Sequence, residues 1–582
     1  MEKQPRNSLR QTTQTYQMPK NVDTRGPWRW IGAALIGLGM VFTGYVLLRS
    51  TTQNGNAQDL DDKDKAGPPL FVEWNKPDLA IIISGQMQGY LQPCGCSDPQ
   101  KGGLTRRYNF VQSLKDRGWP VAAVDLGDIA QPSGPQQRLK YVYSMKALKV
   151  MGYQAIGIGK NEFLMPLTEA LGHYSANFPQ PRLVAANLAE TTKGGLFHAL
   201  NVRQGEIFTI GNLKAGLIGA IGPVTAKEIE KGLPPTEKDI RILDKDTALP
   251  ATLKILTDNK VDLSILLYQG QENEAKDCAK VLHEAHLKNR AIVPVRILVC
   301  LTKEEEPPSL PIKDASAPNT SIITIGHKGR YVGVVGIWKT AKGMDVKYQL
   351  VAMGPEQATK PGKTNPVMDL MEKYAQEVRD GNFLARFPRD NHEVQVALKD
   401  ARYVGTAVCA GCHDDANKVW EKTRHAHAYD TLVKARDPKL RQFDGECIAC
   451  HTVGFKHHTG YYDPPPGATP EKAEKHNLKL LDVGCESCHG PGSAHANNPN
   501  NKDLYSLINP YGPKEKELNP KTPAVVRDDL RKKRMSRMDY VLCQKCHDIE
   551  NDVHWANVPF QQKWDQIAHP SLKKGVDSAK VK

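Results

Sequence analysis

Four pentapeptides of the form Cys-x-x-Cys-His stand in the last third of the chain, and no other feature constrains its fold as strongly. The spacing is typical of c-type haem attachment, because two thiols reach the two vinyl groups of one porphyrin and the adjacent histidine reaches the iron from the proximal side. The motifs supply eight candidate thioether cysteines and four candidate proximal histidines: Cys409, Cys412 and His413; Cys447, Cys450 and His451; Cys485, Cys488 and His489; Cys543, Cys546 and His547.

Zinc ribbons also use paired Cys-x-x-Cys units, so a zinc site is the main alternative. A ribbon does not require a histidine directly after each second cysteine, whereas all four motifs here have one. The sequence therefore predicts four covalently bound haem c groups. The segment that carries them is short and poor in apolar side chains, so it cannot build a large conventional core. We expect the porphyrins to supply much of its interior and to lie close enough together to pass electrons.

The sixth ligand of each iron is not determined by the motifs. A single further histidine in this segment is more often a surface imidazole than a ligand, so each one needs a separate argument. The candidates after the first motif are His425, His427, His457, His458, His476, His495, His554 and His569.

Residues 404–547 resemble the tetrahaem cytochrome c (cytochrome c-prime-type multihaem) family of ammonia oxidisers, which accept electrons from hydroxylamine oxidoreductase. The similarity lies in residues 407–413 with Trp420 and residues 423–427, in residues 446–455 and in residues 482–492. The resemblance implies a compact, mostly helical and loop fold with stacked haems. It also implies bis-histidine ligation of most irons and a second haem that is open on its distal side.

The resemblance suggests distal ligands by position. His425 matches the family's distal histidine after the first motif, and His495 lies where a distal histidine follows the third. His569 is a third candidate, on our own inference, because it closes an amphipathic segment. His457 and His458 follow the second motif closely, so the ligation of the second iron stays open.

Residues 77–355 alternate between short apolar strands and amphipathic helices, which indicates an α/β domain. Their order resembles the 5′-nucleotidase branch of the calcineurin-like metallophosphoesterases. Asp128 matches a metal ligand of that family, but Gln86 and Gln88 replace an Asp-x-His motif, and Lys160 and Asn161 replace further ligands. A hydrolase of this kind needs a two-metal centre to activate water. We therefore expect a degenerate domain that keeps the fold and has lost hydrolysis.

Cys94 and Cys96 form a Cys-Gly-Cys motif in the same domain. A Cys-x-Cys disulfide closes a tight, strained ring that is easily reduced, and Arg106 and Arg107 nearby favour the thiolate. Cys94 and Cys96 are therefore candidate redox thiols. The alternatives are a metal clip, a structural pair, or pairing with Cys278 and Cys300.

Residues 28–48 form an apolar run that as a helix would span about 31 Å, which matches a hydrocarbon layer of about 30 Å. Basic residues dominate before this run and acidic residues follow it. The sequence therefore predicts a single-pass transmembrane anchor in the cell membrane, with the bulk of the chain on the periplasmic or extracytoplasmic side. A cleaved signal peptide, with a weak cleavage site, and a buried core helix are the alternatives.

The 582 residues carry a formal net charge of +14, spread along the chain. No RNA-module motif or aromatic–basic stripe accompanies it, so we expect no nucleic-acid partner. The expected fold class is multidomain, with one N-terminal transmembrane helix, an α/β layered metallophosphoesterase-like domain and a mostly helical and loop multihaem cytochrome c domain. The expected segments are a cytoplasmic basic tail 1–27, an anchor 28–48, a linker 49–76, the degenerate 5′-nucleotidase-like domain 77–355, a linker 356–403 and the tetrahaem domain 404–582.

The function expected from the sequence is that of a membrane-anchored, exported tetrahaem cytochrome c. It would exchange electrons with redox partner proteins, and the phosphoesterase-like domain would serve for docking. One alternative is an oxidoreductase that acts on a small nitrogen or oxygen species at an open haem. The other is a metal-dependent phosphoesterase or nucleotidase.

Overall fold

The computed structural model describes residues 69–93, 100–174, 181–191, 202–237, 239–304, 306–341, 343–435, 439–548, 551–552 and 555–569. All of them belong to one compact unit, residues 63–582. Cys94, Cys96 and His554 lie outside the described residues, so the redox role of the Cys-Gly-Cys motif stays a prediction.

Two sheets form the centre of the middle domain. Strand β1 is buried at every position and apolar except for Ser84 at its end, which is typical of a parallel strand covered on both faces. In the first sheet β1 to β4 and β6 run parallel, and β13 is antiparallel to both β1 and β14. Its order is β14 (Gly343–Ala352), β13 (Tyr331–Thr340), β1 (Leu79–Ser84), β2 (Val121–Asp125), β3 (Tyr153–Gly157), β4 (Arg182–Val184) and β6 (Val202–Arg203).

The second sheet is parallel except at its β7 edge, where β7 pairs antiparallel with β8. Its order is β12 (Ser321–Ile323), β11 (Ile297–Cys300), β10 (Leu263–Gln269), β8 (Leu213–Ile221) and β7 (Gly205–Ile210). A separate pair is formed by β5 (Leu188–Glu190) and β9 (Ile240–Ile242).

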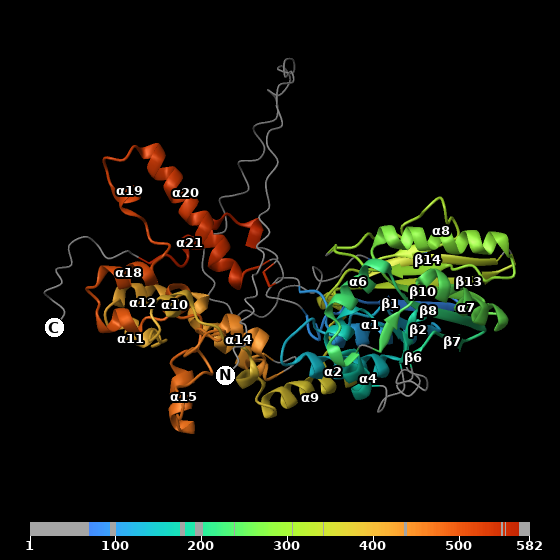
Figure 1. The fold of residues 1–582 in the computed structure, drawn as a ribbon, viewed down its shortest axis with the longest axis horizontal. Helices are drawn as coiled ribbons and strands as arrows, with labels where there is room; N and C mark the ends of the chain where they lie inside the picture. Colours follow the sequence, from blue (N-terminus) through green and yellow to red (C-terminus); the bar gives the residue numbers. More distant parts are fainter. Residues whose placement is uncertain are drawn as a thin grey trace, which may run out of the picture. The chain divides into compact units, whose positions relative to one another are not determined.

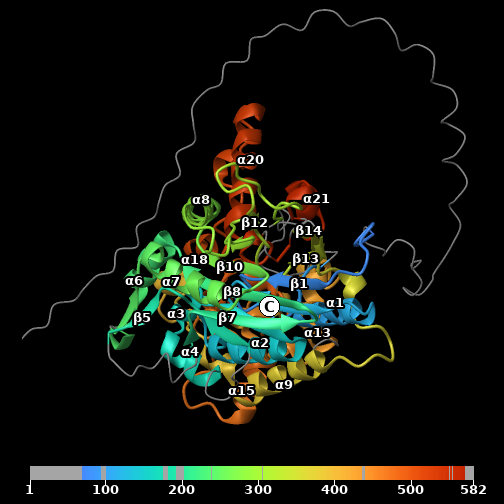
Figure 2. The ribbon, with the colours of Figure 1, turned by 90° about the vertical axis from the view of Figure 1, so that its right-hand side faces the viewer.

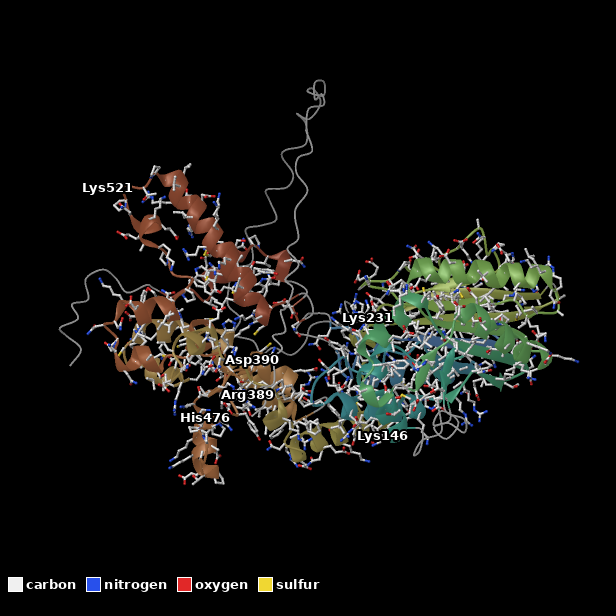
Figure 3. The ribbon with its side chains drawn as sticks, viewed as in Figure 1. Lys146, Lys231, Arg389, Asp390, His476 and Lys521 are labelled. Atoms are coloured by element: carbon white, nitrogen blue, oxygen red, sulfur yellow. The ribbon has the colours of Figure 1, made fainter. Side chains whose placement is uncertain are left out.

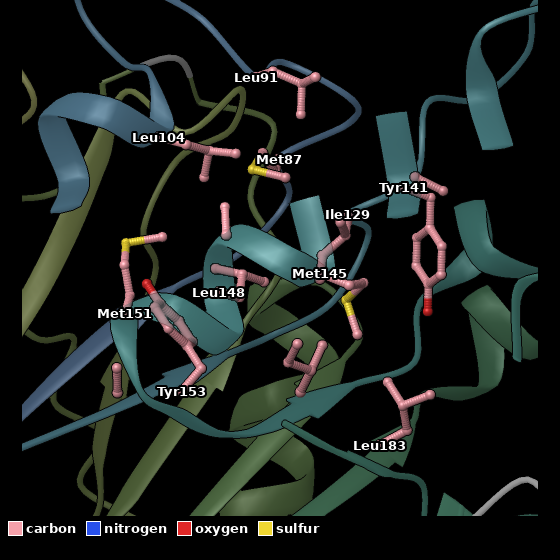
Figure 4. Packing of buried hydrophobic residues seen from close by; sticks show 14 of the residues in the cluster. Met87, Leu91, Leu104, Ile129, Tyr141, Met145, Leu148, Met151, Tyr153 and Leu183 are labelled. Carbon is pink, nitrogen blue, oxygen red and sulfur yellow. The ribbon is translucent and has the colours of Figure 1, made fainter. Parts of the chain in front are cut away.

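Alternate residues of β1 point to opposite sides of the first sheet. Ile81 and Ile83 share a core with the second sheet, whereas Ala80 and Ile82 share a core with helices α1 and α2. Figure 4 shows part of the core between the first sheet and helices α1 and α2, with Met145 and Leu148 of α2 beside Ile129. The domain is therefore layered as helices, sheet, sheet and helices, as Figures 1 and 2 show. The helices are α1 (Leu104–Asp116), α2 (Gln137–Met151), α3 (Lys160–Leu164), α4 (Leu167–Tyr174), α6 (Pro223–Gly232), α7 (Lys245–Asp258) and α8 (Glu272–Lys288).

Helix α9 (Pro366–Asp380) lies within the segment that the sequence predicts to be a linker. Its buried side chains Val367, Met371, Tyr374 and Val378 join the same core as α1 and α2. This helix therefore packs as part of the layered domain.

After α9 the described residues form loops and helices that are short except for α20, with no strand beyond isolated bridges. Their buried apolar cluster is small and includes Tyr403, Ile448 and Phe455. This agrees with the expectation that side chains alone supply little of the interior. The helices are α10 (Glu393–Ala397), α11 (Thr406–Ala410), α12 (Asp414–Trp420), α13 (Ala428–Val433), α14 (Gly445–His451), α15 (Pro470–Leu478), α16 (Cys485–His489), α17 (Ser493–Asn497), α18 (Lys502–Ile508), α19 (Glu515–Leu518), α20 (Ala524–Val541) and α21 (Phe560–Asp565).

The expected fold class needs one correction. Within the part of the chain that the structure describes, no helix combines the length and the apolar character that crossing a membrane requires. Residues 28–48, for which the sequence predicts a transmembrane helix, lie outside the described residues. The described residues form a layered α/β domain followed by a part made of helices and loops.

Candidate functional site

The four Cys-x-x-Cys-His motifs lie on or directly beside single helical turns. The second motif ends α14 and the third forms α16, whereas the first begins in α11 and the fourth begins in a short 3-10 turn, Cys543–Lys545. The amide of His413 donates to the carbonyl of Cys409 at 2.9 Å, and that of His547 donates to the carbonyl of Cys543 at 3.0 Å. A helical turn places residues i and i+4 on one face. Each motif can therefore present its first thiol and its histidine to the same group.

Three motif histidines have their Nδ1 atoms bonded to a fixed acceptor. His451 Nδ1 donates to the carbonyl of Ala428 at 2.6 Å, and His489 Nδ1 donates to the carbonyl of Ile508 at 2.9 Å. His547 Nδ1 lies 2.9 Å from a carboxylate oxygen of Asp552. A hydrogen bond at Nδ1 leaves the Nε2 lone pair for a metal and fixes the ring orientation. These histidines therefore fit the role of proximal iron ligands.

Three pairs of imidazole rings face each other among the described residues. The ring centres of His413 and His495 are 6.2 Å apart, those of His489 and His569 are 6.1 Å apart, and those of His425 and His547 are 6.1 Å apart. Two metal–imidazole bonds of about 2 Å each, plus about 1 Å from each nitrogen to its ring centre, add up to about 6 Å. The three pairs therefore have the spacing that one iron between two histidines requires.

The three distal histidines that the sequence favours, His425, His495 and His569, are each opposite a motif histidine. His495 is opposite the first motif and His569 is opposite the third. His425 follows the first motif along the chain, but it faces His547 of the fourth. The sequence names these histidines, and the tertiary structure determines their partners.

The second motif differs from the other three. No described histidine ring pairs with His451. His457 lies at a right angle to His392 with 5.1 Å between the ring centres, and His458 Nδ1 is 3.6 Å from a carboxylate oxygen of Asp463. His476, which is labelled in Figure 3, donates from Nε2 to the carbonyl of Gly460 at 2.8 Å. The histidines that follow this motif therefore have other neighbours.

The motif thiols approach one another in two groups. The Cys409 and Cys485 sulfurs lie within hydrogen-bonding reach of each other, as do those of Cys450 and Cys546. None of the eight motif cysteines forms a disulfide. The first motif therefore adjoins the third, and the second adjoins the fourth, which places their attachment edges side by side.

A zinc centre has less support from these residues. No group of three or more Cys, His, Asp or Glu side chains in the described part of the chain converges as a metal ion would require. The motif residues fit an attached haem: paired imidazoles at iron spacing, and two thiols beside each proximal histidine.

Gln86, Asp128 and Asn161, which the sequence analysis compared with phosphoesterase metal ligands, follow the carboxyl ends of β1, β2 and β3. The Gln86 side chain is bonded at both ends to the backbone of Thr302, at 3.0 Å from Nε2 and 2.9 Å to Oε1. Asp128 Oδ1 accepts from the amide of Asn161 at 2.9 Å. Gln86 and Asp128 both have left-handed backbone conformations, with φ of 48° and 56°. Protein hydrogen bonds therefore occupy these side chains.

Glu162 fixes the loop that follows β2. Its carboxylate accepts from the amides of Asp128, Ile129, Ala130 and Gly159 at 2.8 to 3.1 Å. Burial raises the pKa of Asp128 to about 6 and, together with the neighbouring Asp128 carboxyl, raises the pKa of Glu162 to about 8. The loop after β2 is thus rigid and carries a shared acidic pair.

Sequence reasoning did not identify several groups that complete these sites. Asp552 belongs to no recognisable motif. The carbonyls of Ala428 and Ile508 are backbone groups, so no residue type in the sequence marks them as hydrogen-bond acceptors. The contacts between the middle domain and Glu446 are equally invisible, because they join residues far apart in the sequence. A fixed local spacing marks a ligand, whereas these partners depend on the fold.

The comparisons with known proteins match the two parts of the chain separately. A family model described as cytochrome c554 and c-prime matches residues 408–490. A curated relative, cytochrome c-554 of Nitrosomonas europaea, is 29% identical over 164 residues, which cover 26% of this chain. The match spans 60% of the length of that relative.

Solved structures are matched as well. A 5′-nucleotidase precursor from Thermus thermophilus is 17% identical with a TM-score of 0.42, and the match covers 59% of this chain and 68% of that one. A calcineurin-like phosphoesterase from Bacillus subtilis is 16% identical with a TM-score of 0.39, and the match covers 51% of this chain and 97% of that one.

The similarity to a cytochrome c family implies covalently bound haem c. The carboxy-terminal part of this chain resembles the cytochrome c554 and c-prime family, and its middle part resembles the 5′-nucleotidases and calcineurin-like phosphoesterases.

Proposed function

We propose that this chain is an exported tetrahaem cytochrome c that passes electrons between redox partner proteins. The observation that carries the proposal is the set of three facing imidazole pairs, each of which contains one motif histidine. The first haem would be bound by His413 and His495, the third by His489 and His569, and the fourth by His547 and His425. The second would be bound by His451 alone among the described histidines.

Bound haem supplies a one-electron iron couple at each site. The chain contributes the rest. The Nδ1 hydrogen bonds orient the proximal rings, and the neighbouring thiols of the first and third motifs, and of the second and fourth, bring the attachment edges together. Closely spaced haems favour rapid transfer along the chain. An extracytoplasmic location is part of the proposal, because it suits covalent haem attachment.

We expect about four haems per chain after expression with haem-maturation machinery. Mass spectrometry of the intact protein and of haem-bearing peptides measures the number and its distribution over the motifs. A purified protein that holds zinc, or that loses its pigment on denaturation, would reject the proposal.

A second candidate function follows from His451, whose ring has no facing histidine among the described residues. An iron with an open distal side could bind and convert a small nitrogen or oxygen species. We expect one high-spin haem per chain, with a spectrum that shifts on addition of nitric oxide or hydroxylamine. Four low-spin irons whose spectra do not change on addition of either compound would exclude this candidate.

The middle domain is proposed to be non-catalytic. Gln86 and Asp128 are engaged by backbone groups where the fold would otherwise place metal ligands. We expect no turnover of nucleotide substrates after addition of manganese or zinc. Measurable hydrolysis that depends on the metal and disappears in Asp128→Asn would instead favour a phosphoesterase.

A further inference from the structure

The start of helix α14, which carries the second haem motif, is hydrogen-bonded to the middle domain. One Glu446 oxygen lies 2.5 Å from Lys140 Nζ, and the other accepts from Gln131 Nε2 at 2.5 Å. The amide of Gly445 donates to Gln136 Oε1 at 3.3 Å. Three side chains from α2 and the loop before it thus contact the two residues that directly precede Cys447.

Of the two charged partners, the one from the middle domain is buried and Glu446 is partly exposed. The Lys140 side chain is only 5% exposed. A buried ammonium is costly unless a carboxylate faces it. Glu446 therefore stabilises the charge of Lys140, and Lys140 in turn holds Glu446 in place. Asp444, the N-cap of α14, accepts from the amide of Glu446 at 3.0 Å and lies close to Lys140. Lys140 therefore faces two carboxylates at the first turn of α14.

Further contacts, both apolar and polar, join the start of α14 to the middle domain; we call this set of contacts the junction. Phe443 packs against the core that contains Tyr374 of α9. The Tyr374 hydroxyl accepts from Gln136 Nε2 at 2.7 Å, so Gln136 joins α9 to the amide of Gly445. A side chain at Gly445 would meet Phe387 at 2.2 Å, so the close approach requires glycine there. The start of α14 thus has little freedom to move.

The anchoring side of the junction is rigid. Gln131 follows the loop after β2, whose backbone amides are bonded to Glu162. That loop stands where the phosphoesterase-like fold would hold a metal ligand, namely Asp128. The degenerate loop is therefore connected through Gln131 to the attachment helix of the second haem.

We propose that the phosphoesterase-like domain is an internal clamp for the second haem, with Lys140, Gln131 and Gln136 as positioning residues. The first, third and fourth haem sites each have a distal histidine to restrain the group from the far side. His451 has no such partner among the described residues. The clamp supplies the missing restraint by fixing Cys447 and, through the same helix, His451. This inference rests on the proposed tetrahaem function and gives the degenerate domain a role that needs no metal.

The test uses the full-length protein with its haems attached. Lys140→Met removes the charge and keeps most of the length of the side chain, and Lys140→Arg restores the charge. Lys149→Met, an exposed position on the same helix, is the matched control. A redox titration followed by absorption and electron paramagnetic resonance resolves the individual haems. Haem-peptide masses verify that all four remain attached.

We expect Lys140→Met to shift the potential of one haem out of four and to change its nitric oxide dissociation constant about tenfold, which is the lower end for outer partners of metal ligands. Lys140→Arg should return both values toward those of the unmodified protein, and Lys149→Met should leave them unchanged. Unchanged values in Lys140→Met, or an equal shift of all four haems, would overturn the clamp. A wild-type protein with fewer than four haems would instead overturn the proposed function, and the mass measurement detects this before any variant is compared.

Discussion

At the scale of single residues, the histidines of the four motifs differ in the group that accepts from Nδ1. His451 and His489 donate to backbone carbonyls, whereas His547 faces the carboxylate of Asp552. A carboxylate makes its imidazole partner more basic and a stronger donor to the metal. The ring of His547 also stacks on Trp555 with 4.3 Å between the ring centres. The fourth haem is therefore expected to favour ferric iron more than its neighbours do.

Asp552→Asn should raise the reduction potential of the fourth haem alone. We expect a change on the order of tenfold in its oxidation equilibrium, or about 59 mV for one electron. A spectroelectrochemical titration measures the four midpoints. Asp565→Asn, an exposed carboxylate on α21, serves as the control for surface charge. Four unchanged midpoints in Asp552→Asn would contradict the assignment.

The carboxyl pair in the middle domain makes a second prediction for single residues. Burial raises the pKa of Asp128 to about 6 and that of Glu162 to about 8 in the folded chain. Folding thus favours their protonated forms, so this contribution to stability is present below the ordinary carboxyl pKa of about 4 and is lost as the pH rises through 6 and 8.

We therefore expect the melting temperature of the middle domain to fall between pH 5 and pH 8. Asp128→Asn removes one charge and keeps an oxygen to accept from the amide of Asn161, so its melting temperature at pH 8 should be higher by on the order of 5 °C. Tryptophan fluorescence follows the transition, with the exposed Asp116→Asn as control. A parallel pH profile in Asp128→Asn would show that the pair does not titrate as described.

At the scale of elements, helix α9 shows how a segment with linker composition becomes part of a core. Asn365 caps the helix by accepting from the amides of Val367 and Met368 at 3.0 and 3.3 Å, and Pro366 occupies its first turn. The capped helix then buries Met371 and Val378 against α1 and α2. The proline-rich composition around it suggests a linker, because composition does not reveal what an amphipathic helix packs against.

Asn365→Ala should lower the free energy of unfolding of the middle domain by more than the cost of about 1 kcal/mol for losing an N-cap, because Asn365 Nδ2 also donates to the carbonyl of Thr105 at 2.9 Å. Guanidinium denaturation followed by tryptophan fluorescence measures the change. Lys373→Ala, exposed on the same helix, should have an effect within about 0.5 kcal/mol. An equal loss in both variants would mean that the cap itself contributes nothing.

At the scale of the whole molecule, the two parts of the chain obtain their interiors differently. The middle domain has large apolar cores on both faces of its sheets. The carboxy-terminal part has one small cluster around Ile448 and Phe455. We infer that the first part folds from side-chain burial, whereas the second depends on its attached groups.

Expression without haem maturation should therefore yield a chain that is folded only in part. Limited trypsin digestion is expected to leave residues 77–380 protected and to cleave within residues 404–569, whereas the protein with haem resists in both regions. Fragment masses identify the cleaved bonds. A carboxy-terminal part that is equally resistant with and without haem would show that side chains suffice there.

The sequence by itself determined what is local in this protein. One helical turn brings the first cysteine and the histidine of each motif to one side, so the proximal ligands and thioether positions can be recognised from spacing alone. Buried apolar runs such as residues 79–84 likewise indicate strands of an α/β domain. The resemblance also supplied His425 and His495 as distal candidates, although without their partners.

Only the tertiary structure decided the pairing. His425 faces His547 across a long stretch of chain, and Lys140 faces Glu446 from another domain. The second motif is distinguished only because His457 and His458 point to other neighbours. The physical reason is that a distal ligand or a buried ion pair depends on two segments meeting in space, and sequence spacing specifies a contact only within one or two turns of a helix.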